Sequence, residues 1–137
     1  MTTYKIGVVV GSLRKESINR QLAQALVKLL PQDFSAEFIE IGDLPLYNQD
    51  FDGNQPAAVG KFKQQIEQQH GIIFVTPEYN RSIPGVLKNA IDHGSRPYGQ
   101  NSWAGKSVGI VGTSPGAPAT SMSQQHLRNT LVFCNMP

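Results

Sequence analysis

An uninterrupted β-branched run near the start of the chain limits the fold more than any other feature. Residues 8–10 are three valines that close the segment 4–10, and such a run is typical of a strand buried on both faces of a parallel sheet. Polar residues 11–19 follow directly, and apolar residues then recur at helical spacing over 18–29. These residues predict a central strand, a polar loop and an amphipathic helix, which together form one βα unit.

The same unit recurs along the chain. Further strands are expected over 36–41, 71–75 and 106–111, and each is followed by a loop and a helix-like segment. Four successive βα units predict an α/β fold, with a doubly wound, mostly parallel sheet and right-handed crossovers. We expect the strand order 2-1-3-4 and a single domain over 1–137. Because a complete sheet of this kind would continue with a fifth strand, we also predict that this strand and the last helix are missing and that the chain is incomplete at its C-terminus.

Composition excludes several classes of protein. The chain has 137 residues and a formal net charge of +2, and its basic residues are scattered, so no nucleic-acid partner is expected. No apolar run is long enough to span a bilayer, which predicts a cytoplasmic protein without a membrane partner. One cysteine and three separated histidines give no metal-ligand spacing, so no metal is expected. We expect Cys134 in the core, His70 at a helix end, and His93 and His126 on helix surfaces.

The loops that follow the first, third and fourth predicted strands carry the candidate functional residues. In doubly wound sheets ligands bind beyond the carboxyl ends of the strands, so these loops are expected to meet there. The first loop offers Ser12, Arg14, Ser17 and Asn19 just before a helix N-terminus, which suits a phosphate monoester. The alternative is an ordinary turn in which Ser17 only caps the helix. In the next loop Tyr79 could cover a planar ring or could simply be a surface aromatic.

Three better-known motifs fail on inspection. Residues 112–116 match the G-x-S-x-G form of a hydrolase nucleophile elbow, but Pro115 lacks the N–H that the oxyanion hole requires. Residues 105–107 resemble the end of a P-loop, but they precede their strand and lack the earlier glycine. No G-x-G-x-x-G occurs, so a dinucleotide bound in the usual two-half manner is not expected.

Two motifs in the right order and context resemble the NADPH-dependent FMN reductase family, on the branch with bacterial chromate and quinone reductases. The first is Gly-Ser-Leu-Arg-Lys-Glu-Ser-Ile-Asn at 11–19, and the second runs from Pro77 to Asp92. The resemblance covers essentially the whole chain. It implies a flavodoxin-like three-layer sandwich, bound FMN, NAD(P)H as co-substrate and a homodimer or homotetramer.

The resemblance also implies roles for particular residues. The first loop would hold the FMN phosphate and ribityl chain, with Leu13, Lys15, Glu16 and Ile18 contributing through their backbone, and the next loop would flank the isoalloxazine. The fourth-strand loop would approach the flavin from the other side, and no catalytic side chain is expected because the flavin carries the hydride chemistry. The cofactor-binding residues expected on this basis are Ser12, Leu13, Arg14, Lys15, Glu16, Ser17, Ile18, Asn19, Pro77, Glu78, Tyr79, Asn80, Arg81, Ser114 and Gly116.

The function implied is an oxidoreductase that passes electrons from NAD(P)H through FMN to small-molecule acceptors: quinones, chromate, azo compounds or free flavin. A flavodoxin-type electron carrier is the main alternative. Such carriers are often strongly acidic, whereas this chain is slightly basic, so charge favours the reductase. A phosphate-binding α/β domain without a flavin is the more distant alternative.

Overall fold

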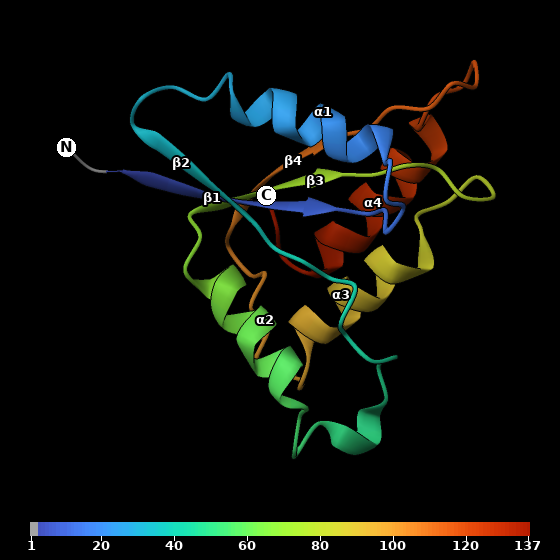
Figure 1. Ribbon diagram of the computed structural model, residues 1–137. Coiled ribbons are helices and arrows are strands. Elements are labelled where there is room, and N and C mark those ends of the chain that lie inside the picture. Colours follow the sequence, from blue (N-terminus) through green and yellow to red (C-terminus); the bar gives the residue numbers. More distant parts are fainter. Residues whose placement is uncertain (1–2) are drawn as a thin grey trace.

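The predicted strand, loop and helix units are present in a computed structural model, which describes residues 3–137 (Figure 1). Four parallel strands lie in the order β2-β1-β3-β4, which confirms the predicted α/β class and strand order. A short 3₁₀ helix, Gln49–Phe51, interrupts the long loop before α2. The elements are β1 (Tyr4–Val10), α1 (Ile18–Val27), β2 (Phe34–Phe38), α2 (Ala57–Glu67), β3 (Gly71–Val75), α3 (Gly85–Ser95), β4 (Ser107–Val111) and α4 (Ser121–Phe133).

The valines of β1 lie at the centre of the sheet. Val8 pairs with Phe38 of β2 on one side and with Ile73 of β3 on the other, and it is fully buried, as a two-sided strand requires. β2 begins and ends earlier than the predicted 36–41. The buried Ile39 packs in the core although it lies just beyond the strand, so apolar character alone placed the predicted strand too late.

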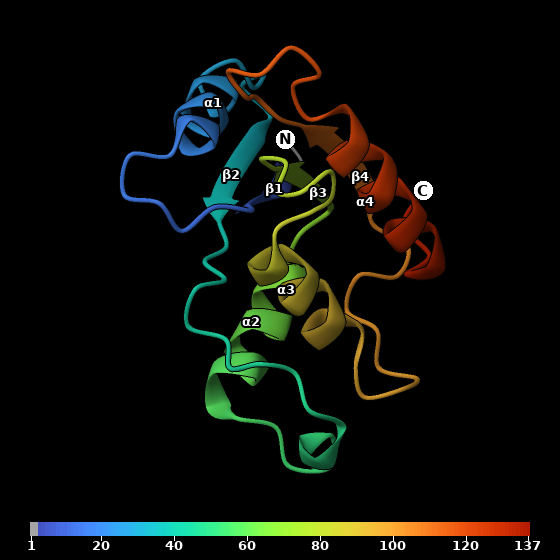
Figure 2. The same ribbon diagram turned by 90° about the vertical axis from the view of Figure 1, so that its right-hand side faces the viewer.

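The helices divide between the two faces of the sheet (Figures 1 and 2). α1 packs on one face through Ala23, which joins Val8, Val10 and Val75 in one cluster. α2, α3 and α4 cover the other face, where the larger cluster includes Phe62, Leu87, Trp103 and Leu127 and the buried thiol of Cys134, as predicted for that residue. Both views show the loop with the 3₁₀ helix extending away from the sheet, beside α2 and α3.

Within residues 3–137, β4 has a strand neighbour on one side only. Val108 and Ile110 of this strand line a shallow groove together with Leu131 and Met136, on the α4 side. The predicted fifth strand and last helix stay a prediction, and the outer edge of β4 is where such a strand would pair. No helix of the described chain is long and apolar enough to cross a membrane. The described histidine, cysteine and acidic side chains form no group of three or more that could hold a metal ion.

Candidate functional site

The carboxyl edge of the sheet brings three polar loops together, as the sequence predicts. The backbone hydrogen bonds between neighbouring strands continue one residue past β1 and β3. Gly11 N–H donates to Val75 O (2.8 Å), and Thr76 N–H donates to Val111 O (3.0 Å). The loops that follow β1, β3 and β4 are therefore aligned at their origin. They surround a depression of about 190 Å³, lined by Ser12, Arg14, Ser17, Ile18, Asn19, Pro77, Glu78, Tyr79, Thr113, Ser114 and Pro115.

The first loop ends at a capped helix N-terminus. Ser17 is the N-cap of α1, and its hydroxyl accepts a hydrogen bond from Arg20 N–H at 3.2 Å. The N–H groups of Ile18 and Asn19 at the same helix end have no carbonyl one turn earlier to bond. Arg14 lines the depression and forms no ion pair with a described carboxylate. Helix N–H groups and a guanidinium thus converge on one small volume, which favours an anion there.

Asn19 joins the first loop to the fourth-strand loop. Its side chain is 2% exposed, its Nδ2 donates to Thr113 O at 3.1 Å, and its Oδ1 accepts from Thr113 N–H at 2.9 Å. These bonds use one hydrogen and one lone pair of the amide. The structure therefore gives Asn19 a positioning role that the sequence did not indicate, and only the second hydrogen or lone pair is left for a ligand.

The loop after β3 ends in a tight turn. Tyr79 and Ser82 exchange two backbone hydrogen bonds of 3.0 Å, and the two residues between them, Asn80 and Arg81, have φ values of 53° and 63°. Two consecutive left-handed residues are the geometry of a type I′ turn, which asparagine accepts more readily than arginine does. The turn leaves Tyr79 49% exposed at the depression and places Asn80 and Arg81 outside its lining.

Glu78 is held by the N-terminus of α4. Its side chain is 7% exposed, and Oε1 accepts from Ser123 N–H at 2.9 Å, while Arg81 Nη1 lies 3.4 Å from Oε2. The hydrogen bond from Ser123 N–H is the main cause that holds the pKa of this carboxyl below its ordinary value. Desolvation raises this pKa, whereas Met122 N–H and Arg81 lower it further. Glu78 therefore stays ionised and fixes the β3 loop to α4.

Ser123 and Gly112 complete this arrangement, and the sequence did not single out either residue as part of the site. Ser123 is fully buried, and its hydroxyl donates to Pro77 O at 2.9 Å. A Cβ at Gly112 would lie 2.2 Å from Thr76 O and 2.5 Å from Thr120 Oγ1, so only glycine allows the fourth-strand loop to approach the β3 loop this closely. The serine position in the first turn of α4 was a weak capping signal, whereas Gly112 stood out only as the first glycine of the rejected G-x-S-x-G match.

The structure places most of the predicted side chains around one depression. The backbone contacts predicted for Leu13, Lys15, Glu16 and Ile18 remain predictions, and the side chains of all four residues are exposed. Leu13 packs over Gly42 instead, where its Cδ2 is 3.0 Å from the position of a Cβ. The residues that line the depression are Ser12, Arg14, Ser17, Ile18, Asn19, Pro77, Glu78, Tyr79 and Ser114, and those that do not are Leu13, Lys15, Glu16, Asn80, Arg81 and Gly116.

The donor set fits one end of a flavin nucleotide. Two serine hydroxyls, Arg14 and the α1 N-terminus match a phosphate monoester, and Tyr79 with Pro77 and Pro115 offers apolar surface beside them. The depression is smaller than the roughly 300–1,000 Å³ of sites that enclose a whole small-molecule ligand. A phosphate and its chain therefore fit inside, and a fused ring would lie at the open side.

Comparison with known proteins identifies relatives along nearly the whole chain. The chain is 55% identical over 132 residues to a 2-hydroxy-1,4-benzoquinone reductase of a Burkholderia species, an alignment that covers 96% of this chain and 72% of that protein. It is 52% identical over 135 residues to a quinone reductase of Pseudomonas putida, with 98% and 73% covered.

A solved structure agrees with this relationship. FerB, a flavoenzyme NAD(P)H:(acceptor) oxidoreductase from Paracoccus denitrificans, superposes with a TM-score of 0.93 at 44% identity, over 98% of this chain and 74% of that one. This likeness confirms the predicted flavodoxin-like fold, and the named relatives confirm the predicted enzyme class, an oxidoreductase with FMN as cofactor and NAD(P)H as co-substrate. The model of the NADPH-dependent FMN reductase family matches residues 4–137, and this chain belongs to that family.

Proposed function

We propose that this chain is an NAD(P)H:quinone oxidoreductase whose FMN phosphate lies in the depression at the carboxyl edge of the sheet. One observation carries the proposal: the free donors of the α1 N-terminus, the guanidinium of Arg14 and the aromatic ring of Tyr79 line the same small volume. The relatives named quinone reductases support a quinone as the acceptor. Chromate, azo compounds and free flavin stay predictions.

The residues of the site bind and orient rather than react. Ser12, Ser17 and Arg14 would hold the phosphate through hydroxyl and guanidinium groups, and Tyr79 would cover part of the ring. When bound, FMN supplies the hydride and electron chemistry. Among residues 3–137, Glu78 is the only carboxylate that lines the depression, and the α4 N-terminus engages it, so it is not free to act as an acid or base.

Two cross-loop contacts prepare this site before any ligand arrives. The Asn19 amide fixes the fourth-strand loop to α1, and the Glu78 carboxylate fixes the β3 loop to α4. Loops held in advance lose less conformational entropy on binding, which favours affinity. The open side of the depression leaves room for the nicotinamide and the acceptor to bind in turn.

The assembly and location of the protein are also proposals. We propose a homodimer or homotetramer, as the family resemblance implies, and a cytoplasmic location, with small molecules rather than nucleic acid or membranes as partners. The single domain over 1–137, incomplete at its C-terminus, remains a prediction.

An anaerobic titration tests the proposed function. The purified protein, loaded with FMN, should lose its flavin absorbance when NADPH or NADH is added and regain it with a benzoquinone. A flavin that binds but is reduced by neither nicotinamide would identify an electron carrier instead. A protein that cannot be loaded with FMN would contradict both functions and leave the phosphate-binding domain.

A further inference from the structure

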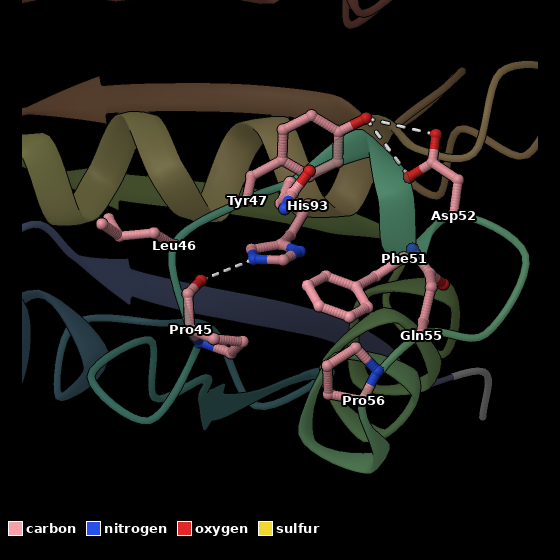
Figure 3. A pocket seen from close by; sticks show the side chains of 9 residues that line it. Pro45, Leu46, Tyr47, Phe51, Asp52, Gln55, Pro56 and His93 are labelled. Atoms are coloured by element: carbon pink, nitrogen blue, oxygen red, sulfur yellow. Dashed lines mark hydrogen bonds between the residues drawn. The ribbon is translucent and has the colours of Figure 1, made fainter.

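A second concavity lies under the loop that carries the 3₁₀ helix, and neither Tyr47 nor His93 offers it a free polar group (Figure 3). The Tyr47 hydroxyl donates to the Asp52 carboxylate at 3.2 Å. His93 Nε2 lies 2.7 Å from Pro45 O, and its Nδ1 is buried in the protein. His93 is 4% exposed, so the prediction that it lies on a helix surface is wrong, because this loop crosses over the end of α3. An unused donor lies instead at the sheet edge, in the loop after β3.

The carbonyl of Pro77 in this loop points into the protein. Its oxygen accepts hydrogen bonds from two side-chain hydroxyls, Thr76 Oγ1 at 2.8 Å and Ser123 Oγ at 2.9 Å. Thr76 and Ser123 are both fully buried, and their hydroxyl oxygens lie 3.4 Å apart. Both lone pairs of the carbonyl are therefore used on its inner side, and its direction is fixed.

The N–H of Glu78 belongs to the same peptide and points the opposite way, toward the depression. This peptide is planar and trans, so its C=O and N–H have opposite directions. Glu78 N–H donates to no acceptor within residues 3–137. Glu78 lines the depression and is half-buried as a residue, although its side chain is only 7% exposed. The main chain of Glu78 is thus the part that meets the depression, and it brings an unused donor there.

Ser123 holds this peptide at two points. Besides the hydroxyl bond to Pro77 O, its backbone N–H donates to Glu78 Oε1 at 2.9 Å. Turning the peptide over would leave two buried hydroxyls without their acceptor, which is costly. It would also present a carbonyl to the depression in place of the N–H. The donor is therefore aimed before any ligand binds, directly beside the Tyr79 ring in the chain.

We propose that Thr76 and Ser123 are positioning residues that aim the Glu78 N–H at the flavin ring and thereby favour its reduced state. The inference rests on the proposed site for FMN. When bound, FMN accepts a hydride as NAD(P)H becomes NAD(P)⁺, which adds one negative charge to the ring. A fixed N–H donor stabilises the charged ring more than the neutral ring, because a charge-assisted hydrogen bond is about twice as strong as a neutral one.

The midpoint potential of the bound flavin, measured in the full chain against a reference dye, tests this role without turnover. Ser123→Ala removes the hydroxyl but keeps the N–H that bonds Glu78. It should weaken reduced FMN relative to oxidised FMN by about 3–10-fold, which lowers the potential by about 15–30 mV, since tenfold is about 30 mV for a two-electron couple. Thr76→Val should also lower the potential, whereas Thr76→Ser, which keeps the hydroxyl, should retain the wild-type value. Ser121→Ala, exposed in the first turn of α4, is the matched control and should change nothing.

Hydrogen exchange of the wild-type chain tests the direction of the N–H even if a variant does not fold. FMN should slow exchange at the Glu78 amide, and it should change less at the Tyr79 amide, which already donates to Ser82 O at 3.0 Å. Unchanged exchange at Glu78 would overturn the proposal, as would potentials of Ser123→Ala and Thr76→Val that match the Ser121→Ala control. A wild-type chain that binds no FMN would overturn the proposed function as well.

Discussion

Replacing Asn19 with alanine should damage both stability and FMN binding, although the residue contributes little surface. The substitution removes two hydrogen bonds to Thr113, at 3.1 and 2.9 Å, and leaves a half-buried peptide N–H and C=O without their partner. A typical intramolecular hydrogen bond contributes about 0.5–1.5 kcal/mol net. We therefore expect the free energy of unfolding, measured by urea denaturation of the FMN-free protein, to fall by about 1–3 kcal/mol.

FMN affinity should fall together with stability, because the loop that Asn19 holds forms one wall of the depression. If half of the lost free energy is expressed in binding, FMN should bind about 2- to 12-fold more weakly in a fluorescence titration, since 1.4 kcal/mol is a factor of ten. Asn19→Asp should bind FMN still more weakly, because it adds a negative charge beside the phosphate. Asn129→Ala, on the exposed part of α4, is the matched control. If Asn19→Ala matches that control in both measurements, the proposed link between the loops is wrong.

Three further substitutions test the site from other directions. Arg14→Ala should weaken FMN binding by about 1.5–3 kcal/mol in the same titration, the worth of a charge-assisted bond, whereas Lys15→Ala outside the depression should change it little. Gly112→Ala should lower the free energy of unfolding by about 1–3 kcal/mol or more through its backbone clash, and Gly53→Ala, where a Cβ meets nothing within 4 Å, should not. The folded-state pKa of Glu78 is lowered below its ordinary 4.5, so its contribution to stability is present above that value and is lost as the pH falls through the folded-state pKa. Denaturation of Glu78→Gln at a series of pH values should show a weaker acid dependence in that window, and an unchanged dependence would contradict the capping role.

The fold was predictable because its signals are local. Short runs of β-branched residues indicate buried strands. β1 and β3 begin and end where the runs at 4–10 and 71–75 indicate. The strand order 2-1-3-4 was predicted because it brings together the polar loops that follow the first, third and fourth strands, where doubly wound sheets bind their ligands. β2 was placed less well, since Ile39 and Ile41 are buried beyond its end, and burial in a loop and burial in a strand leave the same apolar pattern.

The site was predictable only in part. Residue types at the strand ends indicated the anion-binding loop, because helix N-termini and the glycine before them have a local signature. The contact between Asn19 and Thr113 joins residues 94 positions apart, and no spacing rule connects them. The burial of His93 was missed for a related reason, since helical periodicity describes how a helix packs on the sheet and not which loop crosses its outer end.

The contacts that the sequence did not reveal share one physical role. Asn19 uses its side-chain amide to complete the hydrogen bonds of a loop peptide, and Glu78 does the same for a helix end. Ser123 adds a third such contact, to Pro77 O. Each satisfies backbone groups that a loop cannot satisfy by itself, and each thereby removes loop conformations that would not bind a phosphate. Affinity for the nucleotide thus depends on buried polar residues that need not touch it, which is why substitution of Asn19, and not only of Arg14, should reduce binding.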